Sequence, residues 1–170
     1  MIVIPESGMT FGPFADNNVF YIEKSKIYQE LQQRLPIAEF LVLMRDDSIW
    51  IVEAKSSSPN PENKESEKKF DDFITDISDK LIDALTLAVS VIIKRHDNAI
   101  NEIHQNLQNG IISGNAIKLC LIIKGHKDEW LIPIQDALNQ NQQLYRNKKI
   151  WRFEIAVMND EMARMAKLIC

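Results

Sequence analysis

Two apolar runs separated by three polar residues constrain the fold more than any other feature of the sequence. The runs are IAEFLVLM (37–44) and SIWIVEAK (48–55), and the tripeptide Arg-Asp-Asp joins them. A short polar connection between two such runs is typical of a β-hairpin. Each run is apolar apart from isolated charges, as expected for strands that are buried on both faces of a sheet. The sequence therefore predicts a hairpin in the interior of a sheet.

Helical and extended patterns alternate along the remainder of the chain. Apolar residues recur with the 3.6-residue period of a helix over 65–95, which is the longest regular pattern in the sequence. The other expected elements are strands over 117–124 and 151–158, helices over 23–35, 133–146 and 160–169, a loop over 5–18, and an ambiguous segment over 100–114. This order predicts an α/β fold with a mixed central sheet flanked by helices.

Length and composition are those of one globular domain. The 170 residues are 45% hydrophobic and 26% charged, so we expect residues 1–170 to fold around a single core. No apolar run approaches the ~20 residues of a membrane span, and the first residues lack the basic region of a signal peptide. The two cysteines, Cys120 and Cys170, form neither a disulfide framework nor a zinc pattern. These features predict a cytoplasmic protein without a membrane partner.

The net charge of −4 limits the choice of partners. Residues 62–83 contain eight acids and four bases, a balance of −4, so the rest of the chain is close to neutral. A domain that binds nucleic-acid phosphates by itself is usually basic. Any binding of DNA must therefore depend on a local basic patch, a metal ion or a protein partner.

The hairpin also carries the chemical signal of the sequence. Side chains alternate along a strand, so Glu53 and Lys55 point to the same face. Glu39 lies as far before the centre of the turn as Glu53 lies after it, and antiparallel pairing would place the two carboxylates opposite or nearly opposite each other. Two carboxylates can hold a hard divalent cation, and a lysine can position a water molecule or stabilise developing charge. This arrangement suits metal-assisted hydrolysis of a phosphodiester.

The run AEFLVLMRDDSIWIVEAKSSSPNP resembles the PD-(D/E)xK superfamily of restriction-endonuclease-like and exonuclease-like proteins. The pattern of that superfamily is an acid on one strand, a short hairpin, and Glu-x-Lys at the end of the next strand. Glu53-Ala54-Lys55 matches the Glu-x-Lys element, and Glu39 falls where the family usually has Asp. The proline that often precedes this acid is displaced to Pro36.

The resemblance implies a single nuclease-like domain with an α-β-β-β-α-β core. It implies Mg²⁺ or Mn²⁺ as the cofactor, held by Glu39, Glu53 and Glu23, with DNA as the substrate. It also implies that Lys55, Glu53 and Glu39 are the catalytic residues. Glu23 is our choice for the further glutamate that the first core helix often contributes, and Glu30 is the second choice.

Simpler interpretations remain open at this point. Glu53 and Lys55 could form an ordinary surface pair at a strand end, and Glu23 could complement the dipole at a helix N-terminus. The acidic balance favours a non-catalytic protein-interaction module that retains the nuclease fold. A third alternative is a subunit whose DNA-binding surface lies on another chain. Glu39 is one methylene longer than the usual Asp, so an inactive member of the superfamily also fits the sequence.

Overall fold

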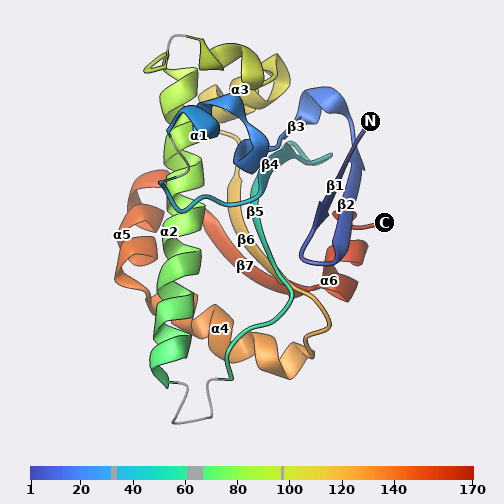
Figure 1. The fold of residues 1–170 in the computed structure, drawn as a ribbon, viewed down its shortest axis with the longest axis vertical. Coiled ribbons are helices and arrows are strands. Elements are labelled where there is room, and N and C mark those ends of the chain that lie inside the picture. The colour runs from blue at the N-terminus through green and yellow to red at the C-terminus, as the bar shows by residue number, and fades with distance from the viewer. Residues whose placement is uncertain (32–33, 61–66, 97) are drawn as a thin grey trace.

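A mixed five-stranded sheet lies at the centre of the molecule, described here by a computed structural model for residues 1–31, 34–60, 67–96 and 98–170. In spatial order its strands are β3 (Val19–Phe20), β4 (Phe40–Leu43), β5 (Ile49–Lys55), β6 (Ile117–Ile123) and β7 (Glu154–Asn159). β3, β4 and β5 are antiparallel neighbours, whereas β5, β6 and β7 run parallel. The predicted mixed sheet with flanking helices is therefore confirmed (Figure 1).

The predicted hairpin is formed by β4 and β5 and lies inside this sheet, because β3 pairs with β4 and β6 pairs with β5. Its polar turn is fixed by its own side chains. Asp46 accepts hydrogen bonds from the backbone N–H of Ser48 at 3.2 Å and from its hydroxyl at 2.6 Å, an arrangement that favours a turn. Every residue of β5 before Lys55 is buried.

The long helix α2 (Glu67–Ile92) covers one face of the sheet, as its apolar period predicts. Ile77, Leu81 and Leu85 are at most 1% exposed and share a buried cluster with Ile51 and Leu121 of the sheet. The same layer contains α1 (Lys26–Glu30), α3 (Gln105–Ile112), α4 (Asp128–Gln140) and α5 (Gln142–Trp151). No helix among the described residues is long and apolar enough to cross a bilayer.

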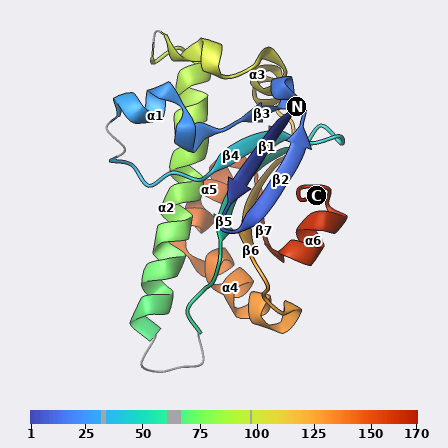
Figure 2. The same cartoon turned by 45° about the vertical axis from the view of Figure 1, so that its right-hand side comes forward.

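The opposite face is covered by a second hairpin, β1 (Ile2–Glu6) and β2 (Met9–Phe14), together with α6 (Asp160–Met165) (Figures 1 and 2). The prediction of a loop over 5–18 is wrong for much of that segment. The dipeptide Ser7-Gly8 has positive φ angles of 49° and 72°, which suit a two-residue hairpin turn. The hairpin is anchored through Phe11 and Phe14, whose rings lie 5.2 and 5.7 Å from that of Phe40.

Several other boundaries differ from the prediction. The helix expected over 23–35 is reduced to a 3-10 helix, η2 (Ile22–Lys24), and α1, while residues 32–33 lie outside the described part. The helix expected from Pro133 begins at Asp128, because two acids in its first turn complement the helix dipole. The remaining 3-10 helices are η1 (Asp16–Asn18) and η4 (Ala99–Glu102).

Candidate functional site

The end of the β4–β5 hairpin away from its turn brings Glu39 and Glu53 together. Phe40 pairs with Val52, and the backbone N–H of Glu39 donates to the carbonyl oxygen of Val52 at 3.0 Å. The ladder ends with the pair of Phe40 and Val52, and Glu39 lies one residue before β4. The exposed fractions of Glu39 and Glu53 are 7% and 0%. The structure thus places two buried carboxylates close together, Glu53 on β5 and Glu39 in the segment that enters β4.

Two lysines hold Glu53. Its Oε1 lies 2.9 Å from Nζ of Lys55 and 2.9 Å from Nζ of Lys80. Lys55 follows Glu53 by two residues on β5, whereas Lys80 belongs to α2, which covers this face of the sheet. The interpretation of Glu53 and Lys55 as an ordinary surface pair is wrong, because Glu53 is fully buried. Lys55 also lies 3.7 Å from Oδ2 of Asp76.

Burial and neighbouring charges shift the pKa values of Glu53 and Lys80 in opposite directions. Burial raises the pKa of Glu53, and the nearby Lys80 and Lys55 offset this only in part. Burial lowers the pKa of Lys80, but attraction to Glu53 outweighs it, so that pKa is raised overall. Oε2 of Glu53 has no hydrogen-bond partner among the described residues. An unpaired buried oxygen of this kind costs free energy unless another group satisfies it.

Glu39 has a different environment. Burial, followed by repulsion from Glu53, Glu23 and Glu6, raises the pKa of Glu39 to about 8. Its Oε2 is also buried without a hydrogen-bond partner in the part of the chain that the structure describes. A carboxyl group in such surroundings is neutral near pH 7 unless a cation compensates its charge.

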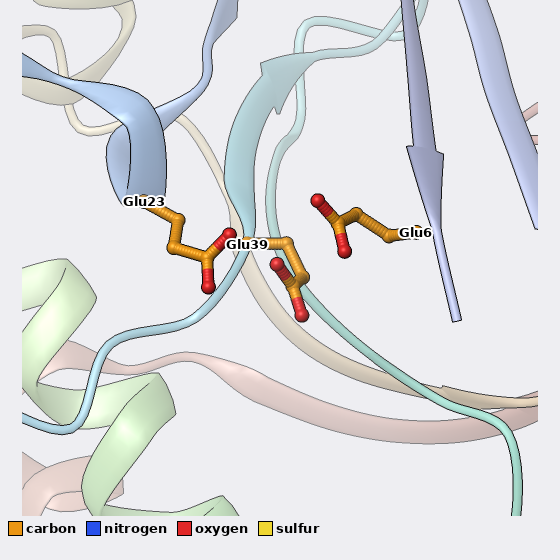
Figure 3. A group of neighbouring side chains, drawn as sticks. All are labelled: Glu6, Glu23 and Glu39. Atoms are coloured by element: carbon orange, nitrogen blue, oxygen red, sulfur yellow. The ribbon is translucent and has the colours of Figure 1, made fainter.

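Three carboxylates from separate segments meet at Glu39. Glu6 at the end of β1, Glu23 in η2 and Glu39 each have a carboxylate oxygen within 4.8 Å of the other two. Glu39 lies between the others, as Figure 3 shows. Glu53 is not part of this group. Glu30, the second choice for the helix glutamate, is exposed at the end of α1 and is also outside it.

The sequence did not point to Lys80, Glu6 or Tyr21. A signal for Lys80 does exist, since it adjoins the apolar stripe of an otherwise acid-rich helix, three residues after the buried Ile77. The predicted loop over 5–18 gives no reason to single out Glu6. Tyr21, whose hydroxyl donates a hydrogen bond to Oε1 of Glu6, could be found only from the packing of two segments.

The structure also joins Ser58 to His126 across the loops that follow β5 and β6. The Ser58 hydroxyl and Nε2 of His126 are 2.7 Å apart. Both residues line a cavity of about 510 Å³ together with Trp130 and Pro133. Ligands of open α/β sheets commonly bind beyond the carboxyl ends of the parallel strands, which is where this cavity lies.

Comparison of the chain with protein-family models, with curated proteins and with solved structures found no match. The site itself therefore carries the functional argument. Its chemistry is that of a buried group of hard oxygen donors bordered by two lysines. Such a group can bind a divalent cation, and the lysines can stabilise a phosphate or a developing negative charge.

Proposed function

We propose that this protein is a metal-dependent nuclease that hydrolyses phosphodiester bonds of DNA. The observation that carries the proposal is the pair of oxygens Oε2 of Glu39 and Oε2 of Glu53. They are the buried side-chain polar atoms without a hydrogen-bond partner in the described part of the chain. They belong to neighbouring residues, since the backbone N–H of Glu39 bonds to Val52, the residue before Glu53. A divalent cation would satisfy both oxygens and offset the repulsion between the two carboxylates.

The donor set fits a hard cation of the Mg²⁺ or Mn²⁺ class. Glu39 and Glu53 would hold it, and carboxylate oxygens are the ligands such ions prefer. Glu23, the third ligand that the resemblance implies, is grouped with Glu39 and Glu6 and not with Glu53. When bound, the cation would polarise the phosphate and lower the pKa of a coordinated water molecule.

The two lysines have separate roles in this proposal. The Lys55 side chain is 27% exposed, so its ammonium group has access to an incoming phosphate and stabilises charge that develops on it. Lys80 contacts the same carboxylate oxygen of Glu53 as Lys55 does. Lys80 therefore holds Glu53 through Oε1, and Oε2 has no partner among the described residues and is available to a cation, which makes Lys80 a positioning residue.

The surroundings of the site support a phosphate-containing substrate despite the net charge of −4. The backbone N–H of Lys124 donates to the carbonyl oxygen of Lys55 at 2.9 Å, and Lys124 is exposed. Two lysines thus adjoin at the carboxyl ends of β5 and β6. The Ser58–His126 cavity opens beyond the same strand ends. The two lysines are basic groups at this end of the sheet through which an acidic domain could meet a phosphate of DNA.

The element order also supports the resemblance to the PD-(D/E)xK superfamily. The strands β3, β4 and β5, then α2 and β6, follow the expected β-β-β-α-β sequence of elements. The position of the first helix departs from the expected core, because α1 follows β3 instead of preceding it. Glu23 consequently lies in η2, between the first strand and α1.

A second candidate function is a non-catalytic interaction module. The observation that favours it is the contact of Glu53 with both Lys55 and Lys80 at 2.9 Å. A buried carboxylate with two ammonium partners is substantially compensated without a cation. Cation binding and DNA cleavage discriminate between the two functions.

The decisive experiment measures cleavage of single- and double-stranded DNA with Mn²⁺, alongside Mn²⁺ binding by calorimetry. Lys55→Ala should reduce the cleavage rate on the order of a hundredfold or more and preserve cation binding. Glu53→Ala should lose both, because a carboxylate is a ligand and an ammonium group is not. Lys69→Ala, which alters an exposed lysine of α2, is the control for lost positive charge. Undiminished cleavage by Lys55→Ala would refute the mechanism, and folded wild-type protein without any cleavage would favour the interaction module.

A further inference from the structure

We infer that the N-terminal β1–β2 hairpin forms part of the metal site, with Glu6, Glu23 and Glu39 together binding one hard divalent cation. The catalytic meaning of this inference rests on the proposed function, which it deepens. It adds a ligand, Glu6, that lies outside the part of the chain resembling the nuclease superfamily. It also gives the hairpin a chemical role in addition to its packing against the sheet.

The geometry brings oxygen ligands from three segments to one point. A carboxylate oxygen of each of the three residues lies within 4.8 Å of the other two, a spacing that one ion between them could bridge. Glu39 is 7% exposed and occupies the middle position (Figure 3). Glu6 and Glu23 are half-buried and approach it from either side.

A second observation distinguishes this group from an ordinary acidic patch. Oε2 of Glu39 is buried and has no hydrogen-bond partner in the described part of the chain. Native proteins pair almost all such atoms with protein groups, water or ions. The unpaired atom belongs to the central member of the cluster, where a shared cation would satisfy it.

The charges around the cluster match one divalent ion. Glu23 has Lys24 as a partner at 2.9 Å, and Glu53 has its two lysines. Among the described residues, no cationic group lies within ion-pair distance of Glu6 or Glu39. When both are ionised, as ligands of a cation must be, these two carboxylates carry two negative charges, and burial of such charges is unfavourable without a counterion. One ion of charge +2 balances them.

Tyr21 orients Glu6 for this role. Its hydroxyl donates a hydrogen bond to Oε1 of Glu6, which leaves Oε2 of that carboxylate available to the cation. Carboxylate ligands of metal ions are commonly held in this way by a neighbouring donor, and loss of such a donor typically weakens binding by about 10- to 100-fold. Tyr21 is thus a positioning residue for a ligand on a different segment.

The test is a titration of the full chain with Mn²⁺, in which free ion is counted by electron paramagnetic resonance. Wild type should bind one ion at this site. Glu6→Gln should weaken binding by at least about tenfold, and Tyr21→Phe by a comparable or smaller factor. Glu67→Gln removes an exposed acid in the first turn of α2 and should leave the affinity unchanged. Thermal unfolding of each variant in EDTA checks that it is folded.

Wild-type affinity in Glu6→Gln, or no Mn²⁺ binding by wild type at millimolar concentration, would overturn the inference. The outcome is separable from that of the proposed function. If Glu53→Gln loses the ion and Glu6→Gln retains it, the cation sits at the Glu39–Glu53 pair, and the nuclease proposal stands without the hairpin. If Glu6→Gln loses the ion but no variant or wild type cleaves DNA, the metal site stands and the nuclease proposal fails.

Discussion

Glu39 and Glu53 are neighbours at the end of the β4–β5 hairpin away from its turn, yet their electrostatic surroundings differ. Glu53 contacts Lys55 and Lys80, which favour its ionised form and oppose the effect of burial. Glu39 lies among other carboxylates instead, and its pKa rises to about 8. Like charges at adjacent positions disfavour simultaneous ionisation. In the metal-free protein, this pair therefore combines a side chain held by two lysines with the carboxyl group of Glu39, which retains its proton near pH 7.

The stability of the metal-free protein should fall as the pH rises from about 4.5 to about 8. Over this interval the unfolded chain has released the Glu39 proton, whereas the folded protein, with a pKa of about 8, still holds it. Ionisation then favours unfolding, by up to ~1.4 kcal/mol for each pH unit. Above pH 8 this contribution is constant. Urea unfolding in EDTA at several pH values measures the effect.

Glu39→Gln provides the comparison, because it removes the titrating group and keeps the shape of the side chain. Glu6, Glu23, Glu53 and Lys80, which also act on Glu39, remain in both proteins. The variant should lose less stability than wild type between pH 5 and pH 8. Parallel pH profiles for the two proteins would show that Glu39 has an ordinary pKa.

Lys80→Met should destabilise the metal-free protein and increase its response to Mn²⁺. The substitution removes one of two ammonium groups from a buried carboxylate, and a hydrogen bond to a charged group contributes about 1.5–3 kcal/mol. A cation restores the lost positive charge, so the stability difference from wild type should narrow in Mn²⁺. Lys69→Met, an exposed change on the same helix, should have little effect in either condition. If the stability difference between Lys80→Met and wild type is the same with and without Mn²⁺, Lys80 is not electrostatically coupled to the site.

At the residue scale, the sequence predicts contacts within the hairpin and misses those made by distant segments. The proximity of Glu39 to Glu53 follows from the length of one turn and the period of a strand. The contact between Lys80 and Glu53 depends on how α2 is rotated over the sheet. The contact between Glu6 and Glu39 depends on where a second hairpin docks. Neither placement is encoded in local spacing.

At the scale of elements, the β1–β2 hairpin connects the termini of the chain to the site. The backbone N–H of Gly12 donates to the carbonyl oxygen of Leu168 at 2.8 Å, so β2 is tied to the segment after α6. Ser7 in the turn donates from its hydroxyl to the carbonyl oxygen of Ala54 at 2.8 Å. These two contacts hold the hairpin, and Glu6 with it, against the sheet.

Gly12→Ala should therefore destabilise the protein and weaken its response to Mn²⁺. Gly12 has a φ of +97°, and an added Cβ would lie 2.7 Å from the carbonyl oxygen of Ile2 on the paired strand. Gly114 is the matched control, since its φ is +76° and nothing lies within 4 Å of an added Cβ. Gly114→Ala should cost about 1–2 kcal/mol from backbone strain alone, and Gly12→Ala should cost more. Equal melting temperatures of the two variants would show that β1 can move away from the added Cβ without a loss of stability.

Helices and strands are predicted correctly where the pattern of apolar residues extends over a long segment. The helical period of α2 and the apolar runs that form β4, β5 and β6 each extend over many residues, so single exceptions do not change the prediction. The β1–β2 hairpin was mistaken for a loop because Pro5, Gly8, Gly12 and Pro13 are frequent in loops. Ser7-Gly8 between two stretches with alternating apolar residues is a hairpin signal that could have been recognised.

At the scale of the whole molecule, the proposed cation site would link folding to cation binding. Its carboxylates come from β1, η2, β5 and the segment that enters β4, so they converge only when the sheet and the N-terminal hairpin have assembled. The unfolded chain has no such arrangement and binds a cation weakly. A ligand that binds only the folded state stabilises it by mass action.

The melting temperature should therefore rise with Mn²⁺ or Mg²⁺ concentration relative to EDTA. At a concentration 100 times the Kd the stabilisation is about 2.7 kcal/mol, and for a protein of this size each kcal/mol shifts the midpoint by roughly 2–4 °C. NaCl at equal ionic strength controls for general screening. Glu39→Gln should abolish the rise, because it removes the central ligand, whereas Glu67→Gln should preserve it. If wild type melts at the same temperature in EDTA and in millimolar Mn²⁺, these carboxylates do not form a cation site, and their repulsion must be relieved by protonation of Glu39 alone.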